Sequence, residues 1–253
     1  MKSLPVQTQD FRKIIEKGQL YVDKTDLLAK LADNDALFLS RPRRFGKSLL
    51  ISTLAEIFKG NQDLFAGLKI LDPELGPKFE FIKYPVVTLD MSIDSYSQEA
   101  LIESLLADLK LIAASHGLKL KKTTPGSALA TLINHIHDDN KQKVVVLIDE
   151  YDYPVSHNIE NLALAKSNST VLSSFYASFK KLQHLLRFVF VTGVTRYAMM
   201  GLSAGFNNLT DISFDSEYAS ICGFTPEELD QYFSGRYPEV LKTLQTREYA
   251  SPD

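Results

Sequence analysis

Two groups of residues in this chain could handle a phosphate chain together with a metal ion. The first is the run Gly46-Lys47-Ser48, and the second is the acidic pair Asp149-Glu150, which directly follows an apolar segment. A lysine and free backbone amides bind phosphate, whereas a hydroxyl and a carboxylate are ligands for a hard cation such as Mg²⁺. Together these residues predict a site for a nucleoside triphosphate with Mg²⁺.

The first group ends a segment, Arg41 to Ser48, that is similar to the P-loop pattern G-x-x-x-x-G-K-S/T between a strand and a helix. The start of such a helix has unpaired N–H groups and a partial positive charge, which attract phosphate. Lys47 is expected to reach the β- and γ-phosphates, and Ser48 to hold Mg²⁺ through its hydroxyl. The residues expected to contact the nucleotide are Arg43, Arg44, Phe45, Gly46, Lys47, Ser48 and Leu49.

One position departs from the pattern, because Arg41 stands where the first glycine is usual. The loop is therefore expected to leave its strand by a different backbone path, part of which Pro42 restricts through its ring. The alternative interpretation is an incidental Gly-Lys-Ser at a helix start. The apolar strand before the loop and the amphipathic helix after it favour the phosphate site.

The second group has the form of a Walker B motif, in which a buried strand ends in acids. Asp149 is expected to bind Mg²⁺, directly or through water, and Glu150 to polarise the attacking water as a general base. Two acids that merely cap a strand end are the alternative. A glutamate beside the metal-binding aspartate favours an ATPase, and the sequence contains no Asn-Lys-x-Asp motif of the GTPase kind.

A further polar segment, Thr192 to Arg196, follows another predicted central strand. Thr192 could contact the γ-phosphate or the attacking water, and Arg196 could supply charge to the transition state in its own subunit or a neighbour's. The alternatives are a threonine that caps its strand and an arginine in a surface ion pair. The predicted catalytic residues are thus Lys47, Glu150, Thr192 and Arg196.

The elements that must position these residues alternate between strand and helix, which predicts a parallel sheet with helices on both faces. Strands are predicted at residues 36–40, 85–90, 143–148 and 187–192, with a weaker one at 211–214. Helices are predicted at residues 48–58, 97–114, 127–137, 171–185 and 225–233. The unbroken apolar run at 143–148 is expected in mid-sheet, buried on both faces.

The predicted fold is an α/β P-loop NTPase sheet of the ASCE or AAA-like kind, in which an extra strand separates the P-loop strand from the Walker B strand. Residues 1–220 are expected to form this domain. Residues 221–253 are expected to begin a small, incomplete helical lid, because Thr225-Pro226-Glu227-Glu228 has the capping residues of a helix start.

Composition limits the class of protein. The chain has 253 residues, 45% of them hydrophobic and 23% charged, with a net charge of −3. These are the values of an ordinary globular protein, without the basic surplus usual in nucleic-acid-binding proteins. The single cysteine, Cys222, excludes an internal disulfide and fits a reducing compartment. No apolar run approaches the ~18 residues of a membrane helix, so we expect a cytoplasmic protein with no membrane partner.

Other kinds of site have weaker support. His135 and His137 lie two residues apart on a predicted helix, so they point to different faces and do not indicate a zinc site. The acids around Asp149 lack the Asp/Glu-x-Lys partner of a nuclease. Tyr21 precedes the P-loop strand, where it is either an adenine contact or a packed surface tyrosine.

With these motifs in place, the chain resembles the AAA-ATPase-like family of bacterial and archaeal P-loop proteins. The resemblance implies an ATPase that uses ATP and Mg²⁺, in which an arginine at the first P-loop position is usual. The matching segments are residues 21–25, 39–48, 147–152, 192–196, 207–212 and 222–225.

Members of that family usually continue through a lid with a Trp-Tyr-x-Gly-Tyr segment into a domain similar to PD-(D/E)XK nucleases. This chain has no tryptophan. We therefore expect a truncated member or the ATPase half alone, with nucleic acid as a partner only through the missing domain. A homo-oligomer is also open. Three functions remain: an ATPase that drives a partner, a slowly hydrolysing switch, or a non-catalytic ATP-binding interaction module.

Overall fold

The structure is a computed structural model that describes residues 1–6, 8–74, 79–196, 205–206 and 208–238. Its centre is a five-stranded parallel sheet in the order β2-β3-β4-β1-β5. The strands are β1 (Ala36–Ser40), β2 (Val86–Asp90), β3 (Val144–Asp149), β4 (Leu186–Gly193) and β5 (Thr210–Asp211). Because β4 lies between β1 and β3, the predicted extra strand between these two is confirmed.

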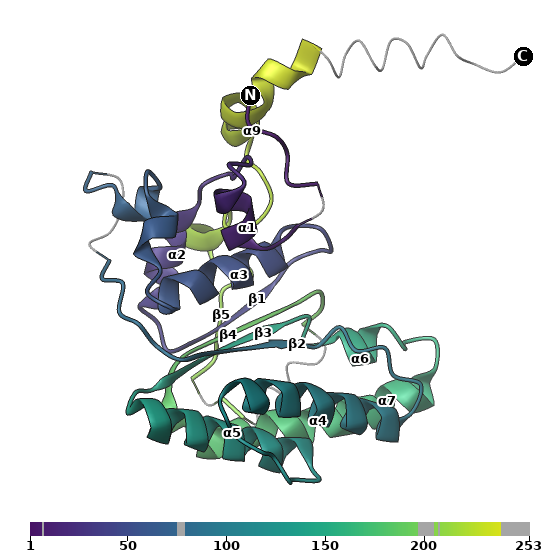
Figure 1. The fold of residues 1–253 in the computed structure, drawn as a ribbon. Coiled ribbons are helices and arrows are strands. Elements are labelled where there is room, and N and C mark those ends of the chain that lie inside the picture. The colour runs from purple at the N-terminus through teal and green to yellow at the C-terminus, as the bar shows by residue number, and fades with distance from the viewer. Residues whose placement is uncertain (7, 75–78, 197–204, 207, 239–253) are drawn as a thin grey trace, which may run out of the picture.

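Helices cover both faces of the sheet (Figure 1). One layer holds α1 (Phe11–Glu16), α2 (Thr25–Ala32) and α3 (Lys47–Phe58), and the other holds α4 (Gln98–Ser115), α5 (Pro125–Asn140) and α7 (Leu162–Ala177). The short α6 (Tyr153–Ser156) follows β3, and α9 (Pro226–Phe233) lies beside the N-terminus. Short 3-10 turns occupy Gln62–Phe65, Lys69–Leu71, Ser178–Lys181, Gln183–Leu185, Ser216–Tyr218 and Ser234–Arg236.

The strand β3 shows why an unbroken apolar run belongs in the middle of this sheet. All six of its residues are buried. Val144, Val146 and Ile148 pack into the core that includes the inner faces of α4, α5 and α7, whereas Val145 and Leu147 pack into the core formed with α2 and α3. Since successive side chains of a strand point to opposite faces, both faces need apolar residues here.

Most predicted elements are present, but two differ. The helix predicted at residues 171–185 begins at Leu162, where Asn161 accepts a hydrogen bond from the Leu164 N–H, and it gives way to 3-10 turns after Ala177. The strand predicted at 211–214 ends at Asp211. Its continuation is instead bonded to the end of β1, because the Ser40 N–H donates to the Ser213 hydroxyl.

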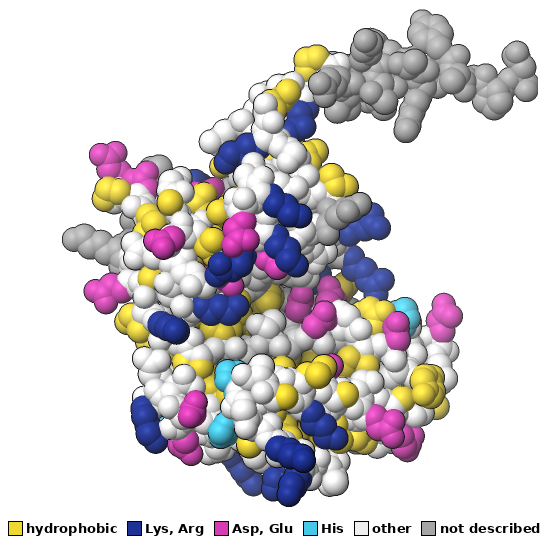
Figure 2. All heavy atoms as spheres, in the orientation of Figure 1, with side chains coloured by type: hydrophobic (Ala, Val, Ile, Leu, Met, Phe, Trp, Pro, Cys, Tyr) yellow, Lys and Arg dark blue, Asp and Glu magenta, His cyan; other side chains and the backbone are white. Residues whose placement is uncertain are grey.

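The helix α9 begins as predicted, with Thr225 and Glu228 forming a capping box. The predicted boundary between a domain of residues 1–220 and a lid of residues 221–253 stays a prediction, and residues 239–253 lie outside the described part of the chain. Over the face shown in Figure 2, acidic and basic side chains are interspersed. None of the described helices is both long and apolar enough to cross a membrane.

Candidate functional site

The three strands that carry the predicted site residues end at the same edge of the sheet. β1 ends at Ser40, β3 at Asp149 and β4 at Gly193. Because the strands are parallel, their carboxyl ends meet, and this edge is where ligands of open α/β sheets bind. The fold therefore brings the segment Arg41 to Ser48, the acidic pair and Thr192 together.

The loop after β1 closes around the side chain of Lys47. Arg44 and Gly46 have φ values of 68° and 96°, in the left-handed region that glycine adopts freely and other residues at a cost. Lys47 is only 3% exposed, and its ammonium donates to the carbonyl of Arg41 at 3.2 Å and to that of Pro42 at 3.3 Å. The ammonium thus lies inside the loop at the start of α3, where the helix dipole also favours an anion.

Arg41 connects this loop to the segment after β5. Its guanidinium donates to the Ser213 carbonyl at 2.6 Å and to the Tyr218 carbonyl at 3.4 Å, while its backbone N–H donates to the Gly193 carbonyl. A glycine could make only the backbone contact. The arginine therefore stabilises the exit of the loop from β1 through side-chain hydrogen bonds to its neighbours.

Asp149 and Thr192 meet between β3 and β4, and both are buried. The Thr192 hydroxyl donates to Asp149 Oδ1 at 2.5 Å, and the Glu150 N–H donates to the same oxygen at 3.0 Å. Within the described part of the chain, Asp149 Oδ2 receives no hydrogen bond. This free carboxylate oxygen and the half-buried Ser48 hydroxyl at the start of α3 are oxygen donors of the kind Mg²⁺ prefers, so these residues fit that ion.

Glu150 turns back from the end of β3 toward the P-loop. Its backbone has φ 50°, and its carboxylate Oε1 lies 3.2 Å from the Lys47 ammonium. The two side chains are 20% and 3% exposed. The structure thus brings four predicted residues, Lys47, Asp149, Glu150 and Thr192, into one connected site.

Two predicted arginines have their own partners. Arg196 forms an ion pair with Asp211 at 2.5 Å, and its guanidinium lies 5.1 Å from the centre of the Phe214 ring. This is the surface ion pair that was the alternative for Arg196, and its role in a transition state stays a prediction. Arg43 is exposed, with its guanidinium 6.0 Å from the centre of the Tyr153 ring.

A pocket of about 590 Å³ opens beside the P-loop. It is lined by the N-terminal segment with α2, by the P-loop with α3, and by α9 with the segment that leads into it. The lining includes Leu4, Tyr21 and Leu28, then Arg44, Phe45, Gly46, Leu49 and Thr53, then Cys222, Gly223, Phe224, Leu229 and Phe233. A mostly apolar pocket with a few polar groups suits a flat heterocycle such as a nucleotide base.

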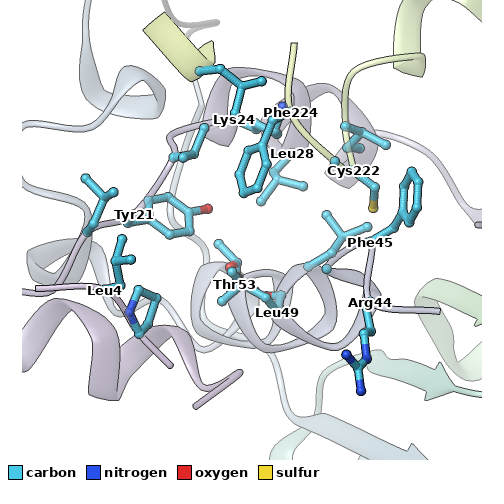
Figure 3. Close-up of a pocket in the computed structure, with 18 of the residues that line it drawn as sticks. Leu4, Tyr21, Lys24, Leu28, Arg44, Phe45, Leu49, Thr53, Cys222 and Phe224 are labelled. Atoms are coloured by element: carbon cyan, nitrogen blue, oxygen red, sulfur yellow. Dashed lines mark hydrogen bonds between the residues drawn. The ribbon is translucent and has the colours of Figure 1, made fainter. Parts of the chain in front are cut away.

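The hydroxyl of Tyr21 points into this pocket, whereas the guanidinium of Arg44 points away from its centre (Figure 3). Burial raises the pKa of Tyr21 above its ordinary value of 10.0, so the hydroxyl stays protonated and can donate a hydrogen bond. Of the two interpretations of Tyr21, the structure places it in a pocket wall; contact with a base is a proposal. Phe45 and Leu49, two of the residues predicted to contact the nucleotide, also line this pocket, and Phe45 lies across it from Tyr21 (Figure 3).

Polar contacts join residues 220–228, which lead into and begin α9, to Lys24 and to the loop after β1. The Lys24 ammonium forms an ion pair with Glu228 at 2.7 Å and donates to the Ser220 carbonyl at 2.5 Å. The Gly223 N–H donates to the Phe45 carbonyl at 3.0 Å, so the segment before α9 contacts the loop after β1 directly. The helix α9 itself buries no side chain, and the Asp23 N–H also donates to its Tyr232 hydroxyl at 3.4 Å.

Sequence reasoning missed the role of Lys24 and the apolar side chains among residues 222–233 that line the pocket. Lys24 and Glu228 lie 204 residues apart, and no local pattern pairs them. The capping residues at Thr225 were the available signal for the position of α9. Lys24 had no such signal, since its burial and that of Asp23 are visible only in the structure.

Two solved structures are similar to this chain at 12% identity. Drosophila ORC bound to GC-rich DNA and Cdc6 has a TM-score of 0.36 over 96% of this chain and 72% of that chain. Drosophila ORC bound to AT-rich DNA and Cdc6 has a TM-score of 0.33 over 83% of this chain and 57% of that one.

The sequence comparisons are more specific. An uncharacterized protein in the vnfD 5' region of Azotobacter chroococcum mcd 1 is 34% identical over 241 residues, which are 94% of this chain and 46% of that protein. This chain therefore spans less than half the length of that relative. The AAA-ATPase-like family, described as predicted AAA-ATPases, matches residues 5–203. The chain belongs to the AAA-ATPase-like family.

Proposed function

We propose that this chain binds Mg·ATP at the carboxyl edge of its sheet and hydrolyses it. The observation that carries the proposal is the position of Lys47. Its buried ammonium lies at the start of α3, held by two P-loop carbonyls and 3.2 Å from Glu150. A buried lysine at a helix N-terminus, next to a neighbouring strand that ends in carboxylates, is the arrangement needed to bind a triphosphate and to activate water for attack on it.

Each part of the site has one role in this proposal. The base occupies the pocket beside Tyr21, and the phosphates lie against the N–H groups of the P-loop and Lys47. Ser48 and Asp149 would hold Mg²⁺, which supplies positive charge next to the phosphate oxygens. Glu150 accepts the proton of the attacking water as a general base.

Thr192 orients the metal-binding carboxylate in this proposal. Its hydroxyl donates to Asp149 Oδ1, which leaves Oδ2 to face an ion. A ligand oriented by a second hydrogen bond loses little freedom when the ion binds.

A slowly hydrolysing switch is the second candidate, and the Lys47–Glu150 ion pair favours it. The base is bound to the lysine that must contact the phosphates, so nucleotide has to separate the two before Glu150 can accept a proton. Single-turnover and steady-state rates distinguish the two functions. A fast chemical step supports the ATPase, and a rate below about one turnover per hour supports the switch, since kinases and related enzymes turn over at roughly 1–100 s⁻¹.

The test is calorimetric titration of Mg·ATP into the wild type and into Lys47→Ala, with phosphate release followed in the same samples. The proposal expects the wild type to bind and hydrolyse and Lys47→Ala to lose both. Lys59→Ala is the matched control, because Lys59 follows the other end of α3 and pairs with Glu56 at 3.0 Å. Absence of binding in the wild type would refute the proposal.

A homo-oligomer in which Arg196 serves a neighbouring active site is part of the same proposal. It predicts that specific activity rises with protein concentration, and a flat specific activity across dilution would count against it. The single cysteine of the chain supports a cytoplasmic location.

A further inference from the structure

Glu150 has a backbone conformation that a residue with a side chain rarely adopts. Its φ is 50°, in the left-handed region. Such strain persists only where the surrounding structure enforces it, and it is often found at functional sites. The proposed general base is therefore held in place by something other than its own preference.

The residue two positions later, Asp152, makes the contacts that could hold this turn. Its carboxylate is 1% exposed. It accepts hydrogen bonds from the Val194 N–H at 3.1 Å, the Thr195 N–H at 2.8 Å and the Thr195 hydroxyl at 2.5 Å. A buried carboxylate is tolerated only when hydrogen bonds replace its water, and bonds to a charged acceptor are the stronger kind.

Tyr151 ties the same two segments together from between Glu150 and Asp152. Its N–H donates to the Thr192 carbonyl and its hydroxyl donates to the Thr195 carbonyl, both at 2.9 Å. Its own carbonyl accepts from the Tyr176 hydroxyl at 2.9 Å. The two residues that follow Glu150 are thus bonded to the end of β4 and to the segment after it.

Close packing at Gly193 shows how tightly the two segments fit. A β-carbon added to Gly193 would lie 2.4 Å from Asp152 Oδ1 and 2.4 Å from Tyr151 Cδ1. No side chain fits there without moving one of them. The turn after β3 and the segment after β4 therefore behave as one unit.

We infer that Asp152 is a positioning residue for the proposed base. Its buried carboxylate, together with Tyr151, fixes the turn after β3 to the segment after β4. This attachment keeps Glu150 in its left-handed conformation and its carboxylate directed at Lys47. The kinetic part of the inference rests on the proposed ATP hydrolysis, whereas the structural part does not.

The kinetic test compares Asp152→Asn with the wild type. The amide has the same shape, but its NH2 group replaces one of the two accepting oxygens and so places a donor against the N–H group of either Val194 or Thr195. We expect kcat to fall about 10- to 100-fold, since a small displacement of a catalytic group has effects of that size. Nucleotide affinity should stay the same or rise, because a displaced Glu150 competes less for Lys47 and the pocket keeps its lining.

Glu56→Gln is the matched control for general loss of stability. Glu56 is also buried and accepts hydrogen bonds from three side chains, those of Arg12, Lys59 and Asn61, but it lies near the far end of α3. It should lower the melting temperature without lowering kcat. If Asp152→Asn keeps the wild-type kcat in an active enzyme, the inference is wrong.

A second test does not need activity. Glu150→Gly and Glu150→Ala both remove the carboxylate, but only glycine relieves the strain at positive φ. Glycine should therefore raise the unfolding midpoint relative to alanine in the wild-type background, and the difference should shrink when Asp152→Asn is added. Comparing the two backgrounds cancels the effect of glycine on the unfolded chain.

An equal difference between glycine and alanine in both backgrounds would overturn the inference, whatever the activity. Failure of the proposed function looks different: the wild type would neither bind nor hydrolyse Mg·ATP. In that case the glycine and alanine variants alone would decide the role of Asp152.

Discussion

The Lys47 ammonium lies 3.2 Å from the Glu150 carboxylate, although the two residues follow strands that are separated by β4. This ion pair joins the phosphate-binding half of the site to the half that would activate water. A triphosphate would compete with Glu150 for the lysine, so nucleotide binding and release of the base are linked.

Glu150→Gln should keep or tighten Mg·ATP binding while lowering turnover by about 10²- to 10⁴-fold, the usual contribution of a general base. Glutamine has the shape of glutamate but cannot accept the proton, and it frees Lys47 from its ion pair. Titration calorimetry and phosphate release on one sample measure both parts. Unchanged turnover would show that Glu150 is not the base.

Thr192→Val should lower the affinity of the nucleotide complex for Mg²⁺ about 10- to 100-fold, as expected when a partner that orients a metal ligand is lost. Valine keeps the size of threonine but removes the 2.5 Å hydrogen bond to Asp149. The measurement is a Mg²⁺ titration at fixed ATP. Thr170→Val is the control, because Thr170 is an exposed threonine on α7 whose hydroxyl donates to the Lys166 carbonyl of the same helix at 3.1 Å. Equal Mg²⁺ curves for both variants would contradict the role of Thr192.

Lys24→Met should speed nucleotide dissociation and lower the free energy of unfolding by roughly 1.5–3 kcal/mol, the range for hydrogen bonds to charged groups. The Lys24 and Glu228 side chains are only 11% and 17% exposed, so Glu228 loses a partner that water replaces poorly. Stopped-flow release of a fluorescent nucleotide and urea unfolding measure the two effects.

Lys30→Met is the control for that variant. Its ion pair with Glu217 is 2.8 Å long, but both side chains are about half exposed, and exposed pairs contribute little. If Lys30→Met accelerates release as much as Lys24→Met does, the Lys24–Glu228 pair has no special role in holding the lid.

Cys222 should make the protein less stable as the pH rises from 9 to 11. Burial raises the pKa of its thiol from 9.0 to about 11, because the thiolate is poorly solvated beside the pocket. The folded state thus keeps a proton that the unfolded state loses above pH 9, and stability falls through this window by on the order of 2 kcal/mol. Below pH 9 the thiol is neutral in both states and contributes no pH dependence.

Urea unfolding between pH 8 and pH 11 would measure this effect. Cys222→Ala should show a shallower loss of stability than the wild type over the same range, since lysines and tyrosines titrate equally in both. Parallel curves would mean that the thiol is solvated well enough to ionise in the folded state.

Local patterns were sufficient for the sheet and for the core of the site. The apolar run before Asp149-Glu150 indicated a strand buried on both faces, which the structure contains. Gly46-Lys47-Ser48 between a strand and a helix predicted a phosphate site at that helix start, which stays a prediction. Helix boundaries were less certain. The helix α7 begins at Leu162 rather than at residue 171, because the Asn161 side chain caps it there. The residues between 162 and 171 are only weakly amphipathic, so their sequence did not indicate a helix.

Contacts between distant residues were beyond such patterns. The ion pair of Lys24 with Glu228 and the hydrogen bonds of Asp152 to Thr195 join residues that have no shared local signal. Each is decided by which loops the folded sheet brings to the same edge. Arg41 is a further example, since only the course of the chain after β5 places carbonyl groups within reach of its guanidinium.

The sequence by itself determined the family, the parallel sheet and the residue types of the proposed phosphate and metal sites, because these depend on periodicity and on short motifs whose chemistry is local. The tertiary structure alone decided how those residues are held. It placed Glu150 against Lys47, closed a pocket between the N-terminal segment and the lid, and bonded the turn after β3 to the segment after β4. Side-chain distances between separate elements depend on the packing of the whole sheet, and no local pattern encodes them.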